Sequence, residues 1–363
     1  MKSGTDNNTH NCFAVFDGGF RGSFPSRAAK AFDSFRSEAS QRVAGGEKPV
    51  WLRIFLSDII NQMPLIREEV NNISASCAVS IIEQPPVNGS KIAVMACFLE
   101  GAAAERTGED AWTVSYRGER YIFQSLRFNA GETSGADGCA QTMEAFERHK
   151  RLIVPLGMTI KDNTLRTWLY CRDIDRTYGG VVRGRNDFFA QNGLTADTHF
   201  IASTGIGGYT SECGAVVGVD FFSRIGGGDG DVKYLQALDH LNPTAQYGVA
   251  FERGTSFAAG GNRVALISGT ASIDRLGNCI NLDNPARQTE RLIENIGALL
   301  ADDGFSESDI KMLIVYLRDA ADRGEVESVV NGRLPGVAAV FTHAKVCRPA
   351  WLVEAECIAV KRT

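Results

Sequence analysis

The sequence has no apolar run that approaches the ~18–20 residues of a membrane-spanning helix. Its first residues, MKSGTDNNTHN, also lack the apolar stretch of a signal peptide. The net charge is −5, and Lys and Arg nowhere form a cluster of five or more, so there is no basic patch for nucleic acid. We therefore expect a cytoplasmic protein that binds neither a membrane nor a nucleic acid.

Paired cysteines and metal-binding motifs are absent as well. The nine cysteines are scattered singly without a CxxC pair, which argues against both a disulfide framework and a zinc site. The five histidines show no HxxH or HExxH spacing, and His149 is expected at a solvated helix position. There is no GxSxG elbow of a serine hydrolase. The sequence thus predicts neither a metal nor an organic cofactor.

Two long stretches of the sequence repeat each other. Ala140–Gly157 reads AQTMEAFERHKRLIVPLG and Arg287–Gly304 reads RQTERLIENIGALLADDG, each with Gln-Thr near its start and Gly at its end. The match continues into a β-rich run, and Asp175 and Asp322 each lie 34 positions after the Gln of their own copy. GERYIFQS and GNRVALIS supply a strand before each helix. Each copy therefore predicts the order strand, turn, helix, strand, helix, strand.

A third and fainter copy lies near the N-terminus. SRAAKAFDSFRSEASQRV has helical apolar spacing, and VWLRIFLSD matches the strand at 166–173. A chain of 363 residues suits two or three domains of ~100–150 residues. We expect units at 11–100, 112–222 and 246–361. RIGGGDGDVK (224–233) is the clearest linker, and EGAAAERTGEDAW makes a softer junction between the first two units.

The third unit has the clearest sequence pattern. It combines a Ser-Gly strand, Gln-Thr at a helix start, Asn-Ile and Leu-Leu along that helix, and Val-Glu-x-Glu-x-x-Ala in the last strand. This pattern resembles the RidA/YjgF (endoribonuclease L-PSP-like) superfamily. The resemblance covers nearly the whole chain, and it is strong in the third unit, moderate in the second and weak in the first.

The resemblance implies an α+β fold of three tandem chorismate-mutase-like barrel units, each a sheet backed by two helices. Because single-unit relatives form trimers, three linked units imply an internal pseudo-trimer, and a monomer or weak homo-oligomer would then suffice.

The chain has a narrower resemblance to chorismatases, which are built from RidA-like units and hydrolyse the enol ether of chorismate. Three segments carry this resemblance: RTWLYCRDI, FERGT and WLVEAE. The stretch GLTADTHFIASTGIGG is only loosely like theirs.

Two glutamates of the last predicted strand are candidate acid catalysts. Glu354 and Glu356 lie two positions apart, so both project from one face of the strand, beside an apolar Trp-Leu-Val run. A carboxyl in such surroundings has a raised pKa, which suits it to deliver a proton. The alternative to a catalytic role is that these glutamates form an ion pair or lie on an exposed strand face. The resemblance favours catalysis, because Glu354 matches the acidic position of the family.

A second strand, LRTWLYC, places Arg166, Trp168 and Tyr170 on one face. A guanidinium pairs with a carboxylate and the two rings supply contact area, so this face suits an anionic, planar, unsaturated substrate. Alternatively, the rings pack beneath a helix and Arg166 forms a salt bridge with an acidic loop. Arg253 and Arg333 are further candidates for binding a carboxylate.

The pattern also departs from that of RidA deaminases. Those relatives carry an Arg in a Pro-Ala-Arg-type segment before the last strand, whereas the corresponding segments here read LPGVAAVF and LTADTHF. The first unit has Ala93 where the acid is expected, and the second has Gly218 there, with Asp220 two positions further on. We therefore expect one competent cleft, where the Arg166 strand meets the Glu354 strand.

Two classes of function remain open. The first is a cofactor-independent hydrolase, deaminase-like or chorismatase-like, that acts on a small anionic metabolite. In it, Glu354 or Glu356 would protonate a carbon before water attacks, and Arg166 would hold the substrate carboxylate. The second is a catalytically inactive protein that binds a metabolite or a regulatory partner. Ribonuclease activity, suggested by the older family label, is not expected of an acidic chain.

Overall fold

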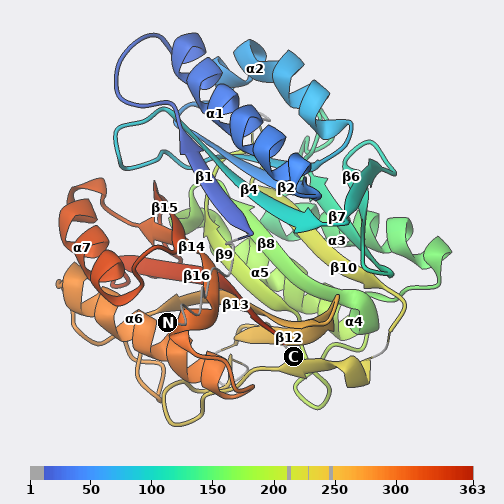
Figure 1. The fold of residues 1–363 in the computed structure, drawn as a ribbon. Coiled ribbons are helices and arrows are strands. Elements are labelled where there is room, and N and C mark those ends of the chain that lie inside the picture. Colours follow the sequence, from blue (N-terminus) through green and yellow to red (C-terminus); the bar gives the residue numbers. More distant parts are fainter. Residues whose placement is uncertain (1–11, 211–213, 228, 245–247, 363) are drawn as a thin grey trace, which may run out of the picture.

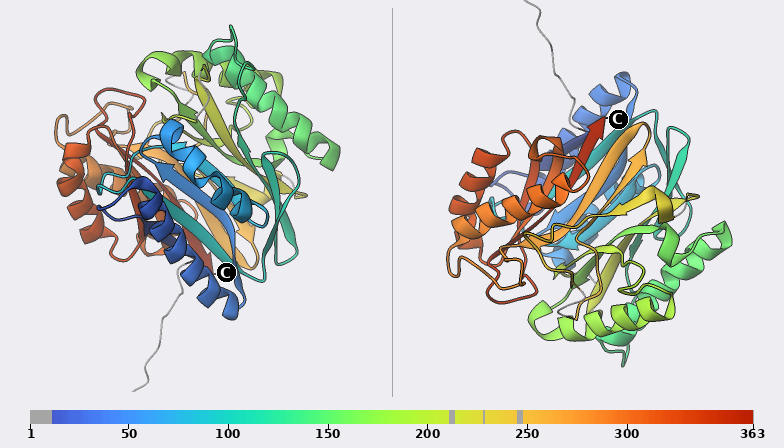
Figure 2. Two further views of the ribbon diagram at one scale, coloured as in Figure 1. Left: turned by 90° about the horizontal axis from the view of Figure 1, so that it is seen from above. Right: turned by 90° about the horizontal axis from the view of Figure 1, so that it is seen from below.

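Three β-sheets turn their inner faces toward one another and carry helices on their outer sides (Figures 1 and 2). The computed structural model describes residues 12–210, 214–227, 229–244 and 248–362. The fold is α+β, and the sheets have four, six and six strands. The expected unit bounds at residues 11 and 246 lie outside the described residues, as does Gly228 of the expected linker.

The first sheet has the strand order β1-β4-β2-β3. It consists of β1 (Phe13–Asp17), β2 (Glu47–Leu56), β3 (Ala78–Glu83) and β4 (Ile92–Glu100), with helices α1 (Phe24–Ala44) and α2 (Ile59–Ser74). Helix α1 begins after Ser23, whose hydroxyl accepts a hydrogen bond from the backbone N–H of Ser26. Pro25 in the first turn breaks no helical hydrogen bond.

The second and third sheets repeat this order and add two strands at the front. The second, β5-β6-β7-β10-β8-β9, consists of β5 (Ala103–Arg106), β6 (Ala111–Tyr116), β7 (Glu119–Leu126), β8 (Thr164–Cys171), β9 (Ala202–Gly207) and β10 (Val217–Ile225), with helices α3 (Gly138–Ile153), α4 (Ile160–Asn163) and α5 (Ile174–Gln191). The third, β11-β12-β13-β16-β14-β15, consists of β11 (Val232–Tyr234), β12 (Gly254–Ala259), β13 (Asn262–Ala271), β14 (Ile310–Leu317), β15 (Ala338–His343) and β16 (Val353–Arg362), with helices α6 (Pro285–Ala301) and α7 (Arg323–Arg333). The predicted order of strands and helices thus recurs, followed by one further strand. The expected linker at 224–233 has its two ends inside β10 and β11.

Each sheet places its last strand, antiparallel, between the first and second strands of the repeated four. In this register Glu354 faces Tyr316, Gly218 faces Tyr170, and Ala93 faces Phe55. Two positions on, Glu356, Asp220 and Met95 are equivalent in the same way. The register therefore agrees with the sequence alignment, in which the third unit alone has an acid at the position of Glu354.

The repeated Gln-Thr motif has a structural reason in both copies. The Gln288 side chain accepts a hydrogen bond from the N–H of Leu352 at 2.9 Å, just before β16 begins. Gln141 does the same for the N–H of Val216 at 2.7 Å, just before β10. Each glutamine is buried and also donates to a loop carbonyl. The motif therefore ties the start of the first helix to the start of the last strand in the second and third units.

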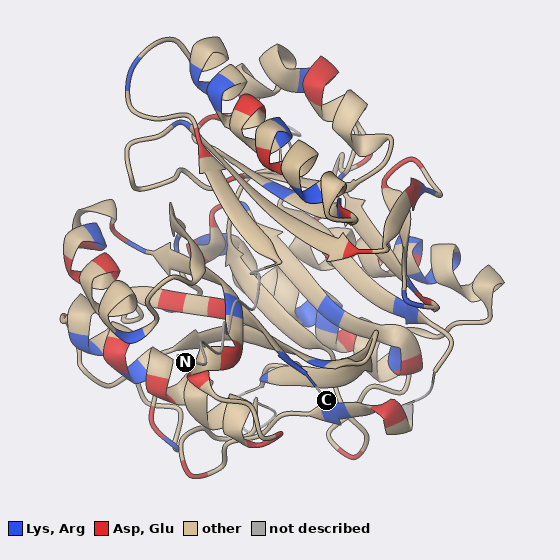
Figure 3. Ribbon diagram, in the orientation of Figure 1, with Lys and Arg blue, Asp and Glu red and all other residues tan. Residues whose placement is uncertain are grey.

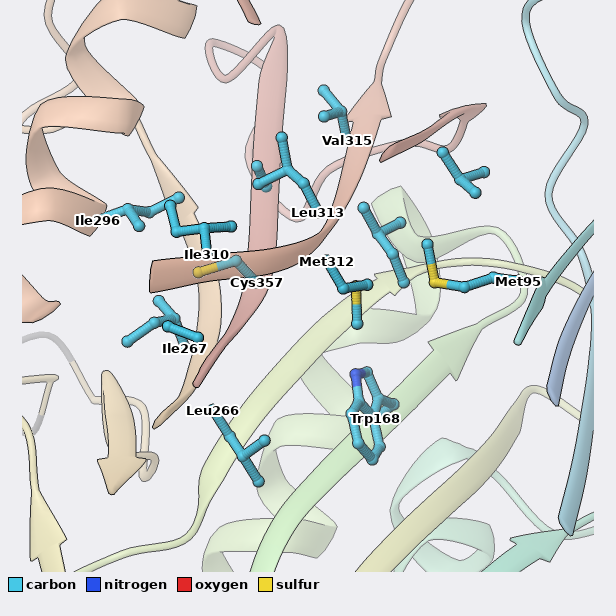
Figure 4. Packing of buried hydrophobic residues seen from close by; sticks show 14 of the residues in the cluster. Met95, Trp168, Leu266, Ile267, Ile296, Ile310, Met312, Leu313, Val315 and Cys357 are labelled. Carbon is cyan, nitrogen blue, oxygen red and sulfur yellow. The ribbon is translucent and has the colours of Figure 1, made fainter. Parts of the chain in front are cut away.

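The inner faces of the sheets share one apolar core. Figure 4 shows Met95 of β4, Trp168 of β8 and Met312 of β14 approaching one another from the three sheets. All three side chains belong to one buried cluster. Fully burying an apolar side chain of this size contributes roughly 1.5–3 kcal/mol. Contacts between segments that are distant in the sequence therefore hold the three sheets together.

His149 is buried, so the expectation of a solvated helix position was wrong. Its ring nitrogens contact Gln124 Oε1 at 2.8 Å and Ser223 Oγ at 2.9 Å, and its ring stacks on Phe221 with centroids 4.1 Å apart. Burial lowers the pKa of His149 to about 3. The reason is that α3 packs this face against β10, where neutral partners replace water.

Charged residues of both signs are interspersed over α1, α2, α6 and α7 in the view of Figure 3. Among the described residues, no helix combines the length and the apolar character that crossing a membrane requires. The outer helices instead follow the amphipathic pattern, with one buried face each.

Candidate functional site

A small cavity of about 40 Å³ lies between the second and third sheets. It is lined by Tyr178, Arg185, Ser203, Thr204, Gly205, Val249, Phe251, Arg253, Gly269, Ala271, Ile273, Cys347, Arg348, Trp351 and Glu354. These residues come from α5, β9, β13 and β16, from the loops before β12 and β16, and from the loop that follows β13. In this state the cavity has room for one or two water molecules. It is the place where the predicted acidic strand meets the second unit.

Glu354 supplies the carboxyl group of this cavity. Its side chain lies against Gly269 of β13, where a Cβ would overlap the Glu354 Oε1 atom. Among the described residues, no hydrogen-bond partner of this carboxyl is seen, and the residue is 3% exposed. Burial raises the pKa of Glu354 from 4.5 to about 8, the charge of Glu356 adds to this, and Arg166 and Arg253 oppose it. At neutral pH Glu354 is therefore mostly a protonated acid.

Two buried arginines face the same cavity. Arg253, just before β12, donates from one terminal nitrogen to the backbone oxygen of Asn242 at 3.1 Å. Arg185 projects from α5. Both guanidinium groups lie over the ring of Phe251, at 5.5 and 5.9 Å from its centroid. Two cations beside a neutral carboxyl make this cavity suitable for an anionic group.

Tyr178 and Cys347 complete the polar wall. Burial raises the pKa of both groups, so both are protonated at neutral pH. The Tyr178 ring occupies the space beside Gly205 of β9, where a Cβ would lie 2.8 Å from Cε2. Gly205 and Gly269 therefore leave room for the two side chains that reach into the cleft from opposite sides.

Glu356, two positions after Glu354, lies in a different environment. Its Oε2 atom accepts from Arg166 at 2.7 Å and from the Thr204 hydroxyl, and its Oε1 atom accepts from Trp168 Nε1 at 2.7 Å. Arg53 of β2 lies 3.3 Å from Oε1. All of these groups are buried. The Glu356 carboxylate of the third sheet is thus satisfied by internal donors from the first and second sheets.

Asp220 forms the other half of this buried cluster. Its Oδ2 atom accepts from Tyr170 at 3.0 Å and lies 3.5 Å from Arg53 Nη2, and its Oδ1 atom lies 3.0 Å from Arg127 Nη1. The Asp220 and Arg53 side chains are fully buried. Paired and hydrogen-bonded charges of this kind are tolerated in a protein interior, whereas a single one is not.

Thr204 connects the buried cluster to the cavity. Its hydroxyl donates to Glu356 and accepts from the N–H of Gly269 at 2.9 Å, and the residue lines the cavity beside Glu354. The charged cluster therefore fixes the position of both β9 and β13 at the cleft. This is a positioning function for groups that do not themselves reach the cavity.

The structure brings the Arg166 strand and the Glu354 strand into contact, but it divides the candidate residues into two groups. Glu354 and Arg253 line the cleft cavity. Arg166, Trp168 and Tyr170 bind the internal carboxylates of Glu356 and Asp220. Their expected role as substrate ligands does not fit this placement, because their polar groups are already paired. For the same reason Glu356, paired with two arginines, does not fit the role of acid.

Arg333 does not belong to the site. It ends α7, its side chain is 39% exposed, and it pairs with Glu307 at 2.7 Å. It does not line the cavity beside Glu354. This exposed and paired position at a helix end does not support the predicted carboxylate-binding role of Arg333.

Arg53 and Arg185 are charged residues that sequence reasoning missed. In α5 the residues Ile174, Tyr178, Val181, Arg185 and Phe188 follow helical spacing on the inner face. A cation inside such an apolar stripe indicates a functional or paired residue, because arginine is seldom buried without one of these roles. Arg53 carries the same signal, since it interrupts the apolar strand VWLRIFL.

The described residues contain no group of three or more His, Cys, Asp or Glu side chains that could hold a metal ion. The ionisable groups at the cleft are instead one carboxyl, the three guanidinium groups of Arg185, Arg253 and Arg348, one phenol and one thiol. Groups of this kind bind and protonate an anionic organic molecule directly.

The third unit matches a known family. Residues 249–361 match the family model described as endoribonuclease L-PSP. This range holds β12 to β16 and Glu354, so the resemblance of the third unit to the RidA/YjgF superfamily is confirmed.

Solved structures extend the comparison to most of the chain. A chorismatase matches 86% of this chain and 92% of its own, at 17% identity and a TM-score of 0.64. A YjgF-family protein from Neisseria meningitidis covers 37% of this chain and 97% of its own, at 24% identity and a TM-score of 0.29. RidA from the Antarctic bacterium Psychrobacter sp. covers 35% and 98%, at 21% identity and a TM-score of 0.30. The chain therefore shares the fold of chorismatase.

Proposed function

We propose that this chain is a cofactor-independent hydrolase that acts on an enol ether or enamine of a small carboxylated metabolite. The proposed site is the cleft between the second and third sheets. The observation that carries the proposal is the Glu354 carboxyl, which is buried, protonated at neutral pH and placed in one cavity with Arg185 and Arg253. The fold shared with chorismatase supports this class of chemistry. Chorismate itself is a dicarboxylate that contains an enol ether.

The reaction needs one proton and one water. Glu354 gives its proton to the terminal CH₂ carbon of the enol ether, and the double-bond electrons form the new C–H bond. The neighbouring carbon becomes an oxocarbenium ion, which the Glu354 carboxylate stabilises. Water adds to this carbon, and its proton returns to Glu354. The resulting hemiketal then releases the alcohol and a 2-oxo acid, so that one water is consumed. An enamine follows the same steps and releases ammonia.

The raised pKa of Glu354 suits both the donation of its proton and the recovery of a proton from water. A general acid works best when its pKa lies near the operating pH, because it must both give and regain a proton. The value of about 8 keeps Glu354 protonated in the resting state. Arg185 and Arg253 would hold the substrate carboxylate in the same cleft, while the phenol of Tyr178 offers a further hydrogen bond.

Substrate entry requires the cleft to widen. The cavity of about 40 Å³ is smaller than a carboxylated metabolite needs. Arg348 and Trp351 line it, and the exposed Arg348 guanidinium lies over the Trp351 ring at 5.4 Å. We assign these two side chains to the mouth, because Arg348 is exposed to solvent and lies over the Trp351 ring.

The small cavity also supports a second candidate function, a catalytically inactive protein that binds a metabolite or a regulatory partner. In that case Glu354 and the arginines would hold a ligand without turnover. Ribonuclease activity finds no support in the cleft, where the donors suit a single small anion.

One experiment separates these functions. The purified chain is incubated separately with three compounds. They are chorismate, the enamine 2-aminoacrylate (with its imine tautomer) generated in place, and a 2-oxo acid that cannot react. Release of pyruvate or ammonia is followed together with thermal stabilisation. Turnover that Glu354→Gln abolishes supports the hydrolase. Stabilisation without turnover supports the binding protein, and turnover that survives in Glu354→Gln overturns the assignment of the acid.

Glu83→Gln is the matched control. Burial also raises the pKa of Glu83, which accepts a hydrogen bond from the N–H of Ile59 at 2.7 Å at the end of β3. It lies outside both cavities. Turnover should therefore be the same in Glu83→Gln and in the unmodified chain.

We also infer that the three units form an internal pseudo-trimer with boundaries near 11–100, 112–222 and 246–361. The common strand order and the shared inner core support this. Fusing the units removes most of the association entropy that three separate subunits would lose. Light scattering coupled to gel filtration is the test. A monomer at micromolar concentration is expected, whereas a stable trimer would contradict the inference.

A further inference from the structure

A second and larger cavity lies among the inner faces of the three sheets. Its volume is about 760 Å³, within the range of roughly 300–1,000 Å³ typical of small-molecule sites. Trp51 of β2, Trp168 of β8 and Leu266 of β13 all line it, so every sheet contributes a wall. It shares no lining residue with the cleft cavity beside Glu354. We call it the inner cavity.

Aromatic rings cover two sides of the inner cavity. Tyr121 and Phe222 stack with centroids 5.3 Å apart and an interplanar angle of 12°, and Phe257 lies 6.3 Å from Tyr121. On the other side Trp51 and Trp168 stack at 6.2 Å. These flat apolar faces favour a planar aromatic occupant, because ring contacts add to the burial of its surface.

The charged residues that line the inner cavity balance one another. The acids are Glu47, Glu100 and Asp309, and the bases are Arg117, Lys311 and Arg362. Two of the acids already have partners: Glu47 pairs with Arg42 at 3.1 Å and Glu100 with Arg117 at 3.2 Å. The lining of the inner cavity thus carries equal numbers of acidic and basic side chains, whereas the cleft is lined by one acid and three arginines.

We propose that the inner cavity is a second binding site, separate from the cleft, and that it takes a neutral planar aromatic molecule. The occupant lies against the Trp168 ring. The Nε1 atom of that ring donates to Glu356, whose carboxylate binds Thr204 at the wall of the cleft. The two sites are therefore joined by one chain of hydrogen bonds, although they have no lining residue in common.

The probe for the first test is N-phenyl-1-naphthylamine, a neutral aromatic amine whose emission rises in apolar surroundings. Titration into the full chain should give saturable binding of one probe per chain. The two cavity tryptophans should be quenched in parallel, because Trp51 and Trp168 both line the site. Emission that rises linearly, without saturation, overturns the proposal.

A blocking variant locates the bound probe. Val264 and Val360 face each other across β13 and β16, both are half-buried, and both line the inner cavity. Val264→Trp should weaken probe binding at least tenfold, and Val360→Trp serves if Val264→Trp does not fold. The control is Val329→Trp, because Val329 is a half-buried valine of α7 outside both cavities. Unchanged binding in folded Val264→Trp overturns the proposal.

Cysteine labelling distinguishes the two cavities. Cys12 lines the inner cavity and Cys347 lines the cleft. A hydrogen bond from Cys97 lowers the pKa of the Cys12 thiol, which favours alkylation. Bound probe should slow the reaction of Cys12 with N-ethylmaleimide at least fivefold and leave Cys347 unchanged, as followed by peptide mass spectrometry. Protection of Cys347 alone would place the probe in the cleft and overturn the proposal.

Discussion

The Glu354 carboxyl lies in the space that a side chain at Gly269 would fill. A Cβ on Gly269 would overlap Glu354 Oε1, and it would lie 3.1 Å from the Thr204 methyl carbon. The backbone at Gly269 is in a region open to any residue, so space and not conformation requires glycine here. The Ser-Gly strand of the third unit and the acid of its last strand thus form one structural unit.

A double-mutant cycle tests this contact. Gly269→Ala should destabilise the protein by about 1–3 kcal/mol, the usual cost of overpacking. In the background of Glu354→Ala the same change should cost less than about 0.5 kcal/mol, because the carboxyl no longer occupies the space. Urea unfolding measures both. Equal costs in the two backgrounds would show that Glu354 does not fill the space beside residue 269.

Glu354 should also make stability depend on pH. Its pKa is about 8 in the folded protein and near 4.5 when unfolded. The folded state therefore holds a proton that the unfolded state loses, so this stabilisation is complete below pH 4.5 and is lost as the pH rises through 8. The full loss is up to about 5 kcal/mol. Glu354→Gln should remove this pH-dependent loss. The free energy of unfolding of the variant, relative to that of the unmodified chain, should therefore rise between pH 5 and 9.

Glu356→Gln should behave differently, although the residue is only two positions away. Glu356 pairs with Arg166 at 2.7 Å and with Arg53 at 3.3 Å, both buried. Removing the carboxylate leaves two buried cations with less compensation, which should cost about 3–5 kcal/mol at neutral pH. Urea unfolding at pH 7 measures it, and Glu354→Gln is the control. A cost below 1 kcal/mol would contradict the pairing.

Sequence reasoning predicted the repeated elements because their determinants are local. Gln141 and Gln288 mark helix starts whose apolar spacing is visible within 16 residues. The two-residue period of β16 also placed Glu354 and Glu356 on one face. The difference between the two glutamates was not predictable in this way. It depends on Arg53, which lies 303 positions before Glu356 and belongs to another sheet.

The burial of His149 also depends on contacts between distant segments and was not predicted from the local sequence. His149 gives a second prediction of pH dependence. Its pKa falls from 6.5 to about 3 on folding, because burial disfavours the charged ring. The stability that neutral His149 provides is present above pH 6.5 and is lost progressively as the pH falls toward 3, by up to about 5 kcal/mol. NMR should show no titration of the His149 ring between pH 5 and 8. A ring that titrates near pH 6.5 would contradict its burial.

The arginines of the cleft give the last prediction. Arg185 and Arg253 line the cavity with Glu354, whereas Arg333 lies at an exposed helix end and pairs with Glu307. Arg185→Lys and Arg253→Lys should each lower kcat/KM for the substrate that the screen identifies by about 30- to 1,000-fold, because lysine cannot reproduce a bidentate contact with a carboxylate. The loss should appear mainly in KM if the guanidinium holds the substrate equally in the ground and transition states. Arg333→Lys should leave both constants unchanged. A loss of similar size in Arg333→Lys would show that the charge of the whole surface, and not the cleft, governs binding.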